Sequence, residues 1–436
     1  MSWLHVLLLV PIVAGSSPPS ICVAPNIFTV PLHCPLEPVH HESFSNSVND
    51  SSSQQEVRWN VSWGCYKAGT NEYCTYTDAH FNSGEGISII TTAESIASIS
   101  NKQAFQNKVS ISKTDGPYRE ARILGRGRGL VATKVLRAGQ NLISQIPAVV
   151  VNADAIEKLK KDEMEDLLAR AADSLPLAHR DKVLELSTHD GAKNHREKVG
   201  KILRTNSFST GFHDGKSNFQ SLFTTISRIN HSCRPNCAYF FDSNTFSQKV
   251  VAVRDIQPRE ELSVAYIDPI MLRSERQMLL KGWGFECSCE RCSANATQVA
   301  ESDGNITEIQ RLWRELDNYS ASSRATPAMA ERLILLYHRE GLESRIQEAH
   351  YRAAVEWIGV GEIEKASEHA MRCVKYGTLF KGPGRPFIKK MEQLLGSPTA
   401  HPHWMFRLKH SDVQRPLSPE MLGNFRLPYC GTAAAS

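Results

Sequence analysis

The chain has 436 residues, and its contents of 41% hydrophobic and 22% charged residues are ordinary for globular protein, which excludes a wholly disordered chain. This length is enough for more than one domain with its own buried core. The 50 Lys and Arg residues against 46 Asp and Glu residues give a formal net charge of +4. That charge is too balanced to predict direct binding of nucleic acid.

The first residues form a short apolar stretch. Residues 3–14 (WLHVLLLVPIVA) are followed by small residues, which predicts a secretory signal peptide over residues 1–15. A disordered terminus is the alternative, because no Lys or Arg precedes the stretch and Pro11 interrupts it. The stretch is too short to span a bilayer and no other stretch is long and apolar enough, so we predict no membrane span in the mature chain.

Two regions of different character follow. Residues 16–56 are rich in Ser, Pro and Asn, and we predict an irregular linker. Residues 57–116 mix aromatic and β-branched side chains, which favours strands and loops packed against another part of the molecule. Cys65 and Cys74 lie here. They would close a disulfide loop in an oxidising compartment or remain two buried thiols in a reducing one.

Apolar and alternating runs around glycines predict strands in residues 117–151. A helical insert is expected at about 152–205, because apolar residues recur there at helical spacing in a charged background and Pro176 breaks the pattern. Residues 219–292 return to β character, with turn residues at 242–244 between two expected strands.

Beyond residue 305 the pattern is helical to about residue 400. Residues 348–377 resemble one tetratricopeptide-like helix–turn–helix unit, since small residues recur where two helices would meet. One such unit cannot bury its own apolar face, so flanking helices must join it. These are expected at 306–319, 327–340 and 386–395. The Pro-rich tail at 401–436 predicts no particular structure.

Two cysteine-containing segments indicate chemistry. Asn230-His231-Ser232-Cys233 is followed by Pro235-Asn236, and its first three residues also form a glycosylation sequon. Cys287-x-Cys289-x-x-Cys292 places three thiols at metal-ligand spacing, whereas tetrahedral zinc takes four sulfur or nitrogen ligands. Disulfide bonding or simple burial of the three cysteines are the alternatives.

Two further segments are ambiguous alone. Residues 125–130 (GRGRGL) could be a β-turn with solvated arginines, and they do not fit a Rossmann fingerprint because no strand–loop–helix unit follows. Tyr266 ends the run Glu-Glu-Leu-Ser-Val-Ala-Tyr, where a buried core tyrosine is the alternative to a functional one.

In this order and at these separations, the segments resemble the catalytic half of SET-domain protein methyltransferases, most closely the SET-and-MYND type. The resemblance covers residues 117–292, including a post-SET zinc segment at 283–292, and extends into a helical domain at 305–400. It implies an α+β fold, with a β-rich SET domain that contains a pseudoknot and a helical insert, and then an all-α C-terminal domain. The chain departs from this type because no cysteine lies between Val151 and Asn206, so the MYND zinc module is absent.

The resemblance also implies roles for individual residues. Tyr266 would be the catalytic residue, whose hydroxyl orients a lysine amine, and Phe208 would line the lysine channel. A structural zinc ion would be held by Cys233, Cys287, Cys289 and Cys292. The residues assigned to the methyl donor, S-adenosylmethionine, are Arg126, Gly127, Arg128, Asn206, Asn230, His231 (through its backbone), Tyr266 and Phe285.

The implied function is a protein-lysine N-methyltransferase acting on a protein substrate, histone or non-histone. A catalytically inactive SET-fold scaffold that binds partners through its helical domain is the first alternative. A secreted, disulfide-bearing glycoprotein is the second, favoured by the signal-like start and by further sequons at Asn49, Asn60, Asn295, Asn305 and Asn318. The family implies the nucleus or cytoplasm, whereas a signal peptide implies secretion.

Overall fold

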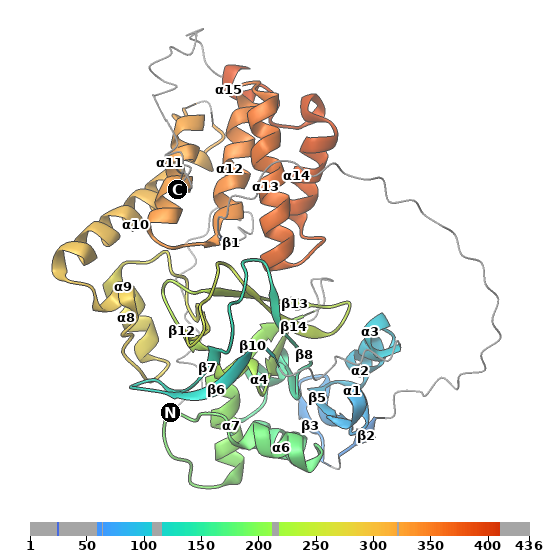
Figure 1. Ribbon diagram of the computed structural model, residues 1–436. Coiled ribbons are helices and arrows are strands. Elements are labelled where there is room, and N and C mark those ends of the chain that lie inside the picture. Colours follow the sequence, from blue (N-terminus) through green and yellow to red (C-terminus); the bar gives the residue numbers. More distant parts are fainter. Residues whose placement is uncertain are drawn as a thin grey trace.

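The computed structural model describes residues 24–25, 59–106, 116–211, 218–320 and 322–409, apart from residue 63. The predicted signal peptide, nearly all of the predicted linker and residues 410–436 of the tail lie outside the described residues. Within the described residues, no helix is both long and apolar enough to cross a membrane. Figure 1 shows a helical layer stacked on a region of strands, with the insert helices at the opposite end.

The region at 57–116 is built into the largest sheet of the molecule. The sheet has the order β10-β11-β9-β5-β4-β2, and β3 also pairs with β4. Its central contact is the parallel pairing of β5 (Ile87–Thr91) with β9 (Val149–Asn152). Both strands consist almost entirely of buried residues, as expected for strands that are covered on both faces. The N-terminal region therefore extends the sheet and is no separate module.

The remaining strands of this sheet come from the N-terminal region and from the middle of the SET region. They are β2 (Asn60–Val61), β3 (Tyr66–Ala68), β4 (Asn71–Asp78), β10 (Phe208–Thr210) and β11 (Phe219–Leu222). A disulfide joins Cys65 to Cys74, at positions that face each other across the β3–β4 hairpin. Three short helices complete the N-terminal region, namely α1 (Phe81–Gly84), α2 (Ala93–Ser100) and α3 (Gln103–Gln106).

The predicted insert is mainly helical, with a non-helical stretch at residues 185–194. It contains α4 (Ala153–Lys158), α5 (Lys161–Asp173), α6 (Leu177–Leu184) and α7 (His195–Asn206). Helix α5 buries Met164, Leu167 and Leu168 in one core with Ile90 and Val151 of the large sheet. The apolar spacing seen in the sequence is thus the face that covers this sheet.

Smaller sheets form the centre of the SET region. Strands β6 (Tyr118–Ile123) and β7 (Gly127–Ala132) form a hairpin, and β8 (Asn141–Gln145), β14 (Ser247–Ala252) and β13 (Cys237–Asp242) form a three-stranded sheet. The short helix η2 (Ile226–Arg228) leads into β12 (Asn230–His231), which pairs in parallel with β15 (Ser263–Val264). On its other side the chain before β15 bonds to β7, where the Leu262 N–H donates to the Leu130 carbonyl at 2.7 Å. The segment thus passes between β7 and β12, the crossing expected of the pseudoknot.

The C-terminal region is all-helical apart from one short strand. Helices α8 (Arg273–Lys281) and α9 (Glu290–Ser293) lead into α10 (Ala296–Leu316), α11 (Pro327–Arg339), α12 (Ile346–Gly359), α13 (Ile363–Lys381) and α14 (Pro386–Gly396). Helices α12 and α13 correspond to the predicted helix–turn–helix unit, and Ala353, Ala366 and Ala370 are completely buried there. Strand β16 (Ser344–Arg345) pairs with β1 (Ala24–Pro25).

The helical layer continues into the stretch assigned to the tail by its sequence. Helices η3 (Pro398–Ala400) and α15 (Phe406–Lys409) follow α14. Trp404 and Phe406 pack against the helical core, and the Arg407 guanidinium donates to the Glu356 carboxylate at 3.0 Å. Residues 401–408 therefore pack as part of the helical layer.

Candidate active site and metal centre

Tyr266 lies where β12 and β15 end side by side. Its hydroxyl donates a hydrogen bond of 2.7 Å to the Ile229 carbonyl. Its ring lies 5.2 Å from the ring of Trp283, 5.5 Å from that of His231 and 6.4 Å from that of Phe285. Burial raises the pKa of Tyr266 well above its usual value, so the hydroxyl stays protonated at neutral pH. The structure thus presents a neutral hydroxyl inside an aromatic shell.

His231 connects Tyr266 to the cysteine group through its side chain. Its Nδ1 accepts the Tyr266 backbone N–H at 3.0 Å, and its Nε2 lies 3.3 Å from the Cys233 sulfur. Because Nδ1 accepts a hydrogen bond, the ring proton is assigned to Nε2, which donates to the Cys233 sulfur. Burial lowers the pKa of His231 to about 4, which keeps the ring neutral. The sequence assigned only the His231 backbone to the site, because a side-chain bond to a strand far along the chain leaves no local pattern.

Two predicted donor-binding residues converge on one carboxylate, that of Glu261. Arg126 Nη1 lies 2.6 Å from Glu261 Oε2, and the Asn230 amide donates to Glu261 Oε1 at 2.7 Å. Arg126 also donates through Nη2 to the His231 carbonyl. The sequence placed Glu261 in the tyrosine motif but gave it no role of its own.

Glycines in the segment that follows Arg126 allow the side chains of Glu261 and Asn230 to lie close to its backbone. A Cβ on Gly129 would lie 2.8 Å from Glu261 Oε1 and 2.9 Å from the Asn230 side-chain nitrogen, so a larger residue would collide with both. Gly127 has a φ of +75°, a conformation that favours glycine.

Arg128 and Asn206 face the helical insert. Arg128 is half-exposed and pairs with Glu120 at 3.1 Å and with Glu185 at 3.0 Å. The Asn206 side-chain nitrogen donates to the Ser187 and Ile202 carbonyls, each at 2.8 Å. The structure therefore brings Arg126, Asn230 and His231 together, and it engages Arg128 and Asn206 with the insert.

Phe208 forms part of an aromatic wall. Its ring is edge-on to Phe223 at 5.8 Å and to Tyr239 at 5.2 Å. Phe208, Tyr239 and Tyr266 pack against the same core. Burial raises the pKa of Tyr239, so this wall carries no charge at neutral pH. The sequence placed Tyr239 on a strand but did not assign it to the site.

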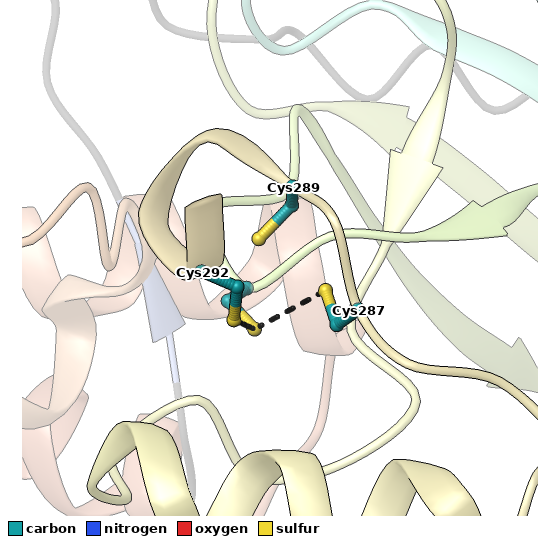
Figure 2. Close-up of side chains that lie close together, drawn as sticks. Cys287, Cys289 and Cys292 are labelled. Atoms are coloured by element: carbon teal, nitrogen blue, oxygen red, sulfur yellow. Dashed lines mark hydrogen bonds between the residues drawn. The ribbon is translucent and has the colours of Figure 1, made fainter. Parts of the chain in front are cut away.

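The four predicted metal ligands come together in space (Figure 2). The sulfurs of Cys233, Cys287, Cys289 and Cys292 all lie within 4.8 Å of one another, and all four residues are buried free thiols. Cys233 Sγ is 3.6 Å from Cys292 Sγ and 4.0 Å from Cys287 Sγ. Tetrahedral zinc with Zn–S bonds of about 2.3 Å requires sulfurs about 3.8 Å apart, so this set fits a zinc ion.

Polar groups surround this centre. Hydrogen bonds among the four cysteines lower the pKa of Cys289 and Cys292 and raise the pKa of Cys233 and Cys287. The buried Arg276 places Nη2 3.8 Å from the Cys292 sulfur. Gln277 and the Cys287 backbone exchange two hydrogen bonds of 2.8 and 2.9 Å. Four thiolates around Zn²⁺ carry a net negative charge, which the Arg276 cation and the His231 N–H offset.

Comparison with known proteins agrees with this geometry. Residues 127–267 match the model of the SET domain family. Human histone-lysine N-methyltransferase SMYD3 is 29% identical over 203 residues, which cover 46% of this chain and 44% of that protein. Histone-lysine N-methyltransferase set5 of Schizosaccharomyces pombe is 24% identical over 297 residues, which cover 65% of this chain and 85% of that protein.

The name of a third relative includes both SET and MYND. The SET domain and MYND-type zinc finger protein 6 of S. pombe is 42% identical over 85 residues, or 19% of this chain and 17% of that protein. The matched segments thus span less than half of two of these three relatives. Taken with the fold and the converging site, the matches show that residues 127–267 of this chain are a SET domain and that the chain is similar to the SET-and-MYND methyltransferases.

Proposed function

We propose that this protein is an S-adenosylmethionine-dependent protein-lysine N-methyltransferase. The observation that carries the proposal is the neutral Tyr266 hydroxyl, buried in an aromatic shell beside the strand that carries Asn230 and His231. Two of the three relatives are named as histone-lysine methyltransferases, so a lysine of a protein, with histones as the first candidates, is the proposed acceptor. The nucleus or cytoplasm is the proposed location.

The proposed binding site for S-adenosylmethionine is built from groups that already bind a carboxylate in this structure. The Arg126 guanidinium and the Asn230 amide both contact the Glu261 carboxylate, so their N–H groups are arranged for such a group. We propose that Arg126, Asn230 and the His231 backbone hold the amino-acid end of the donor and that Phe285 covers its adenine. Gly127 lets the backbone approach. Arg128 and Asn206 would shape the site through the insert.

S-adenosylmethionine supplies an electrophilic methyl group on a sulfonium when it is bound. Transfer breaks the methyl–sulfur bond as the methyl–nitrogen bond forms in line, so alignment is the main requirement. The lysine amine, with a free pKa of about 10.4, must first release a proton, and an apolar wall of Phe208 and Tyr239 favours its neutral form. The Tyr266 hydroxyl donates to the Ile229 carbonyl, which leaves its oxygen free to accept a hydrogen bond from the amine and orient it.

The proposed zinc ion is structural. Cys233, Cys287, Cys289 and Cys292 would fill its coordination shell, so no position remains for substrate. Its effect would be to fix the segment that carries Trp283 and Phe285, whose rings lie against Tyr266 and His231.

The test compares the wild type with Tyr266→Phe. We expect methyl transfer from tritiated S-adenosylmethionine to core histones to fall about 100-fold or more, since an orienting hydrogen bond is lost from the transition state. Donor affinity by calorimetry should change little. Equal loss of transfer and donor binding would mean that Tyr266 is a structural residue only.

In the scaffold alternative, the Glu261 carboxylate would keep the N–H groups of Arg126 and Asn230 occupied. A wild-type protein without measurable affinity for S-adenosylmethionine would establish that alternative.

The disulfide between Cys65 and Cys74 favours an oxidising compartment. Thiol counting with zinc analysis addresses the glycoprotein hypothesis, because disulfides among Cys287, Cys289 and Cys292 would exclude the metal.

A further inference from the structure

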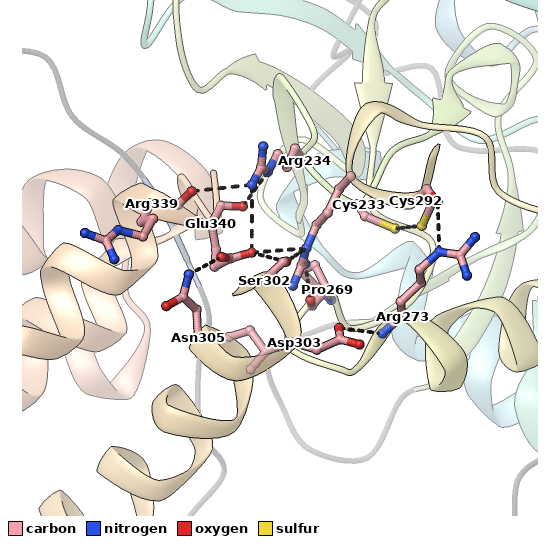
Figure 3. A network of polar contacts seen from close by, with 12 residues as sticks. Cys233, Arg234, Pro269, Arg273, Cys292, Ser302, Asp303, Asn305, Arg339 and Glu340 are labelled. Carbon is pink, nitrogen blue, oxygen red and sulfur yellow. Dashed lines mark hydrogen bonds and ion pairs between the residues drawn. The ribbon is translucent and has the colours of Figure 1, made fainter. Parts of the chain in front are cut away.

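The helical layer contacts the loops of the metal centre through a buried carboxylate, that of Glu340. Arg234 follows Cys233 in the chain and Arg291 precedes Cys292, and both arginines contact Glu340 just after α11. Figure 3 shows Arg234 beside Glu340. Two loops that supply candidate zinc ligands from distant parts of the sequence are therefore tied to one residue of the helical layer.

The Glu340 carboxylate is buried, and both of its oxygens accept hydrogen bonds. It accepts from the Ser302 hydroxyl at 2.5 Å and from the Asn305 amide at 2.8 Å, and it lies 3.2 Å from Arg291 Nε. The side chains of Arg291 and Glu340 are only 1% and 2% exposed. Charges removed from water to this extent are stable only as a pair. The Glu340 backbone carbonyl also accepts from Arg234 Nε at 3.0 Å.

The same arginine reaches the chain that follows the catalytic tyrosine. Arg291 Nη1 donates to the Pro269 carbonyl at 2.7 Å. The next residue, Ile270, is buried in the core of the helical layer, and Gln310 donates to its carbonyl at 3.2 Å. Asp268 forms an ion pair with the buried Arg345. The segment that leaves Tyr266 is thus contacted both by the metal loop, through Arg291, and by the helical layer.

We propose that Glu340 is a positioning residue for the SET site. Through Arg234 and Arg291 it sets the separation of the Cys233 loop and the Cys292 loop, and through Arg291 and Pro269 it holds the chain beside Tyr266. The helical layer then has a defined part in assembling the site. The expected effect on turnover rests on the proposed methyltransferase function, whereas the expected effect on metal retention does not.

If Glu340 had only a structural role, its substitution should have the same effects as substitution of any other buried glutamate of the helical layer. Glu356 is the matched control, because it is buried and pairs with Arg407, at 3.0 Å from Oε2 to Nε. Its contacts lie within the helical layer, away from the metal loops. Glu340→Gln and Glu356→Gln each leave a buried arginine without its anion, and both should lower the melting temperature of the full-length protein.

The decisive measurement is zinc release from full-length protein to a colorimetric chelator below the melting temperature of each variant. We expect Glu340→Gln to weaken zinc retention about 10- to 100-fold, as changes next to metal ligands do, and Glu356→Gln to match the wild type. Hydrogen exchange in residues 266–273 should rise in Glu340→Gln only. In methyl transfer, Glu340→Gln should lower kcat more than it raises KM for the donor.

Equal zinc retention and equal exchange in the two variants would overturn the proposal. A wild type that binds zinc but transfers no methyl group would overturn the proposed function and leave the metal result valid. If Glu340→Gln does not fold, Asn305→Ala removes one hydrogen bond from Glu340 without stranding a charge. This variant should still release zinc faster than Glu356→Gln, and a wild-type release rate would count against the proposal.

Discussion

Cysteines stabilise two regions of this molecule in opposite ways. In the N-terminal hairpin, Cys65 and Cys74 are nine positions apart and are joined covalently across adjacent strands. At the site, Cys233 lies 54 positions before Cys287 and 59 before Cys292, and all remain free thiols. The first pair closes a loop that local strand pairing already defines. The second group joins segments that come from distant parts of the sequence.

The surroundings of the two groups show the same contrast. The hairpin is held to helix α5 by the Tyr66 hydroxyl, 2.9 Å from Asp166, and by Arg170, which donates to the Gly64 carbonyl at 2.9 Å. The cysteine-rich segment contains one helix of four residues, Glu290–Ser293, and therefore has few backbone hydrogen bonds of its own. We infer that the hairpin would tolerate loss of its disulfide, whereas the site depends on its ligands.

The largest effect is expected from Cys289→Ser. Removing one of four thiolates should lower zinc affinity by more than the roughly 100-fold that a change beside a ligand costs, because metal binding and folding of such a segment are linked. Methyl transfer should be lost, since Trp283 and Phe285 would no longer be held against Tyr266. Zinc content by mass spectrometry and transfer to core histones measure the two effects.

Cys237→Ser is the control for this prediction. Cys237 is equally buried, but its sulfur faces the Asn236 side-chain oxygen at 3.5 Å and lies outside the cysteine quartet. The hydroxyl of serine can make the same contact, so zinc content should remain that of the wild type. Full zinc occupancy in Cys289→Ser would refute the assignment of the quartet as the metal centre.

An intermediate effect is expected at His231, where two substitutions separate its two bonds. The amide oxygen of His231→Asn can replace Nδ1 and accept the Tyr266 N–H, whereas the longer His231→Gln can place an amide N–H near Cys233. His231→Asn should therefore lose zinc about tenfold more readily. His231→Gln should retain zinc and lose about fivefold in kcat, the value of one net hydrogen bond. Equal losses of both properties in both variants would reduce His231 to a packing residue.

The sequence could predict the quartet because cysteine and its spacing have few chemical uses, and it could predict α12 and α13 because small residues recur at helical intervals. It could not predict that β5 pairs with β9, since the choice of a partner 61 positions away depends on the whole sheet. Glu340 was equally hidden, because a glutamate at a helix end usually faces water. In the fold it is buried beside Arg291, Ser302 and Asn305.

The smallest effect on activity is expected from the double variant Cys65→Ser/Cys74→Ser. A cross-link that spans a separation of 9 residues stabilises by about 2.5 kcal/mol through the entropy of the unfolded chain, so urea unfolding of the N-terminal region should shift by that free energy. Zinc content and methyl transfer should stay at wild-type values, because Tyr66 and Arg170 still hold the hairpin to α5. A reductant should shift the wild type to the stability of the variant and leave the variant unchanged. Loss of methyl transfer in this variant would show that the hairpin, like the quartet, helps to hold the site, and the contrast between the two cysteine groups would fail.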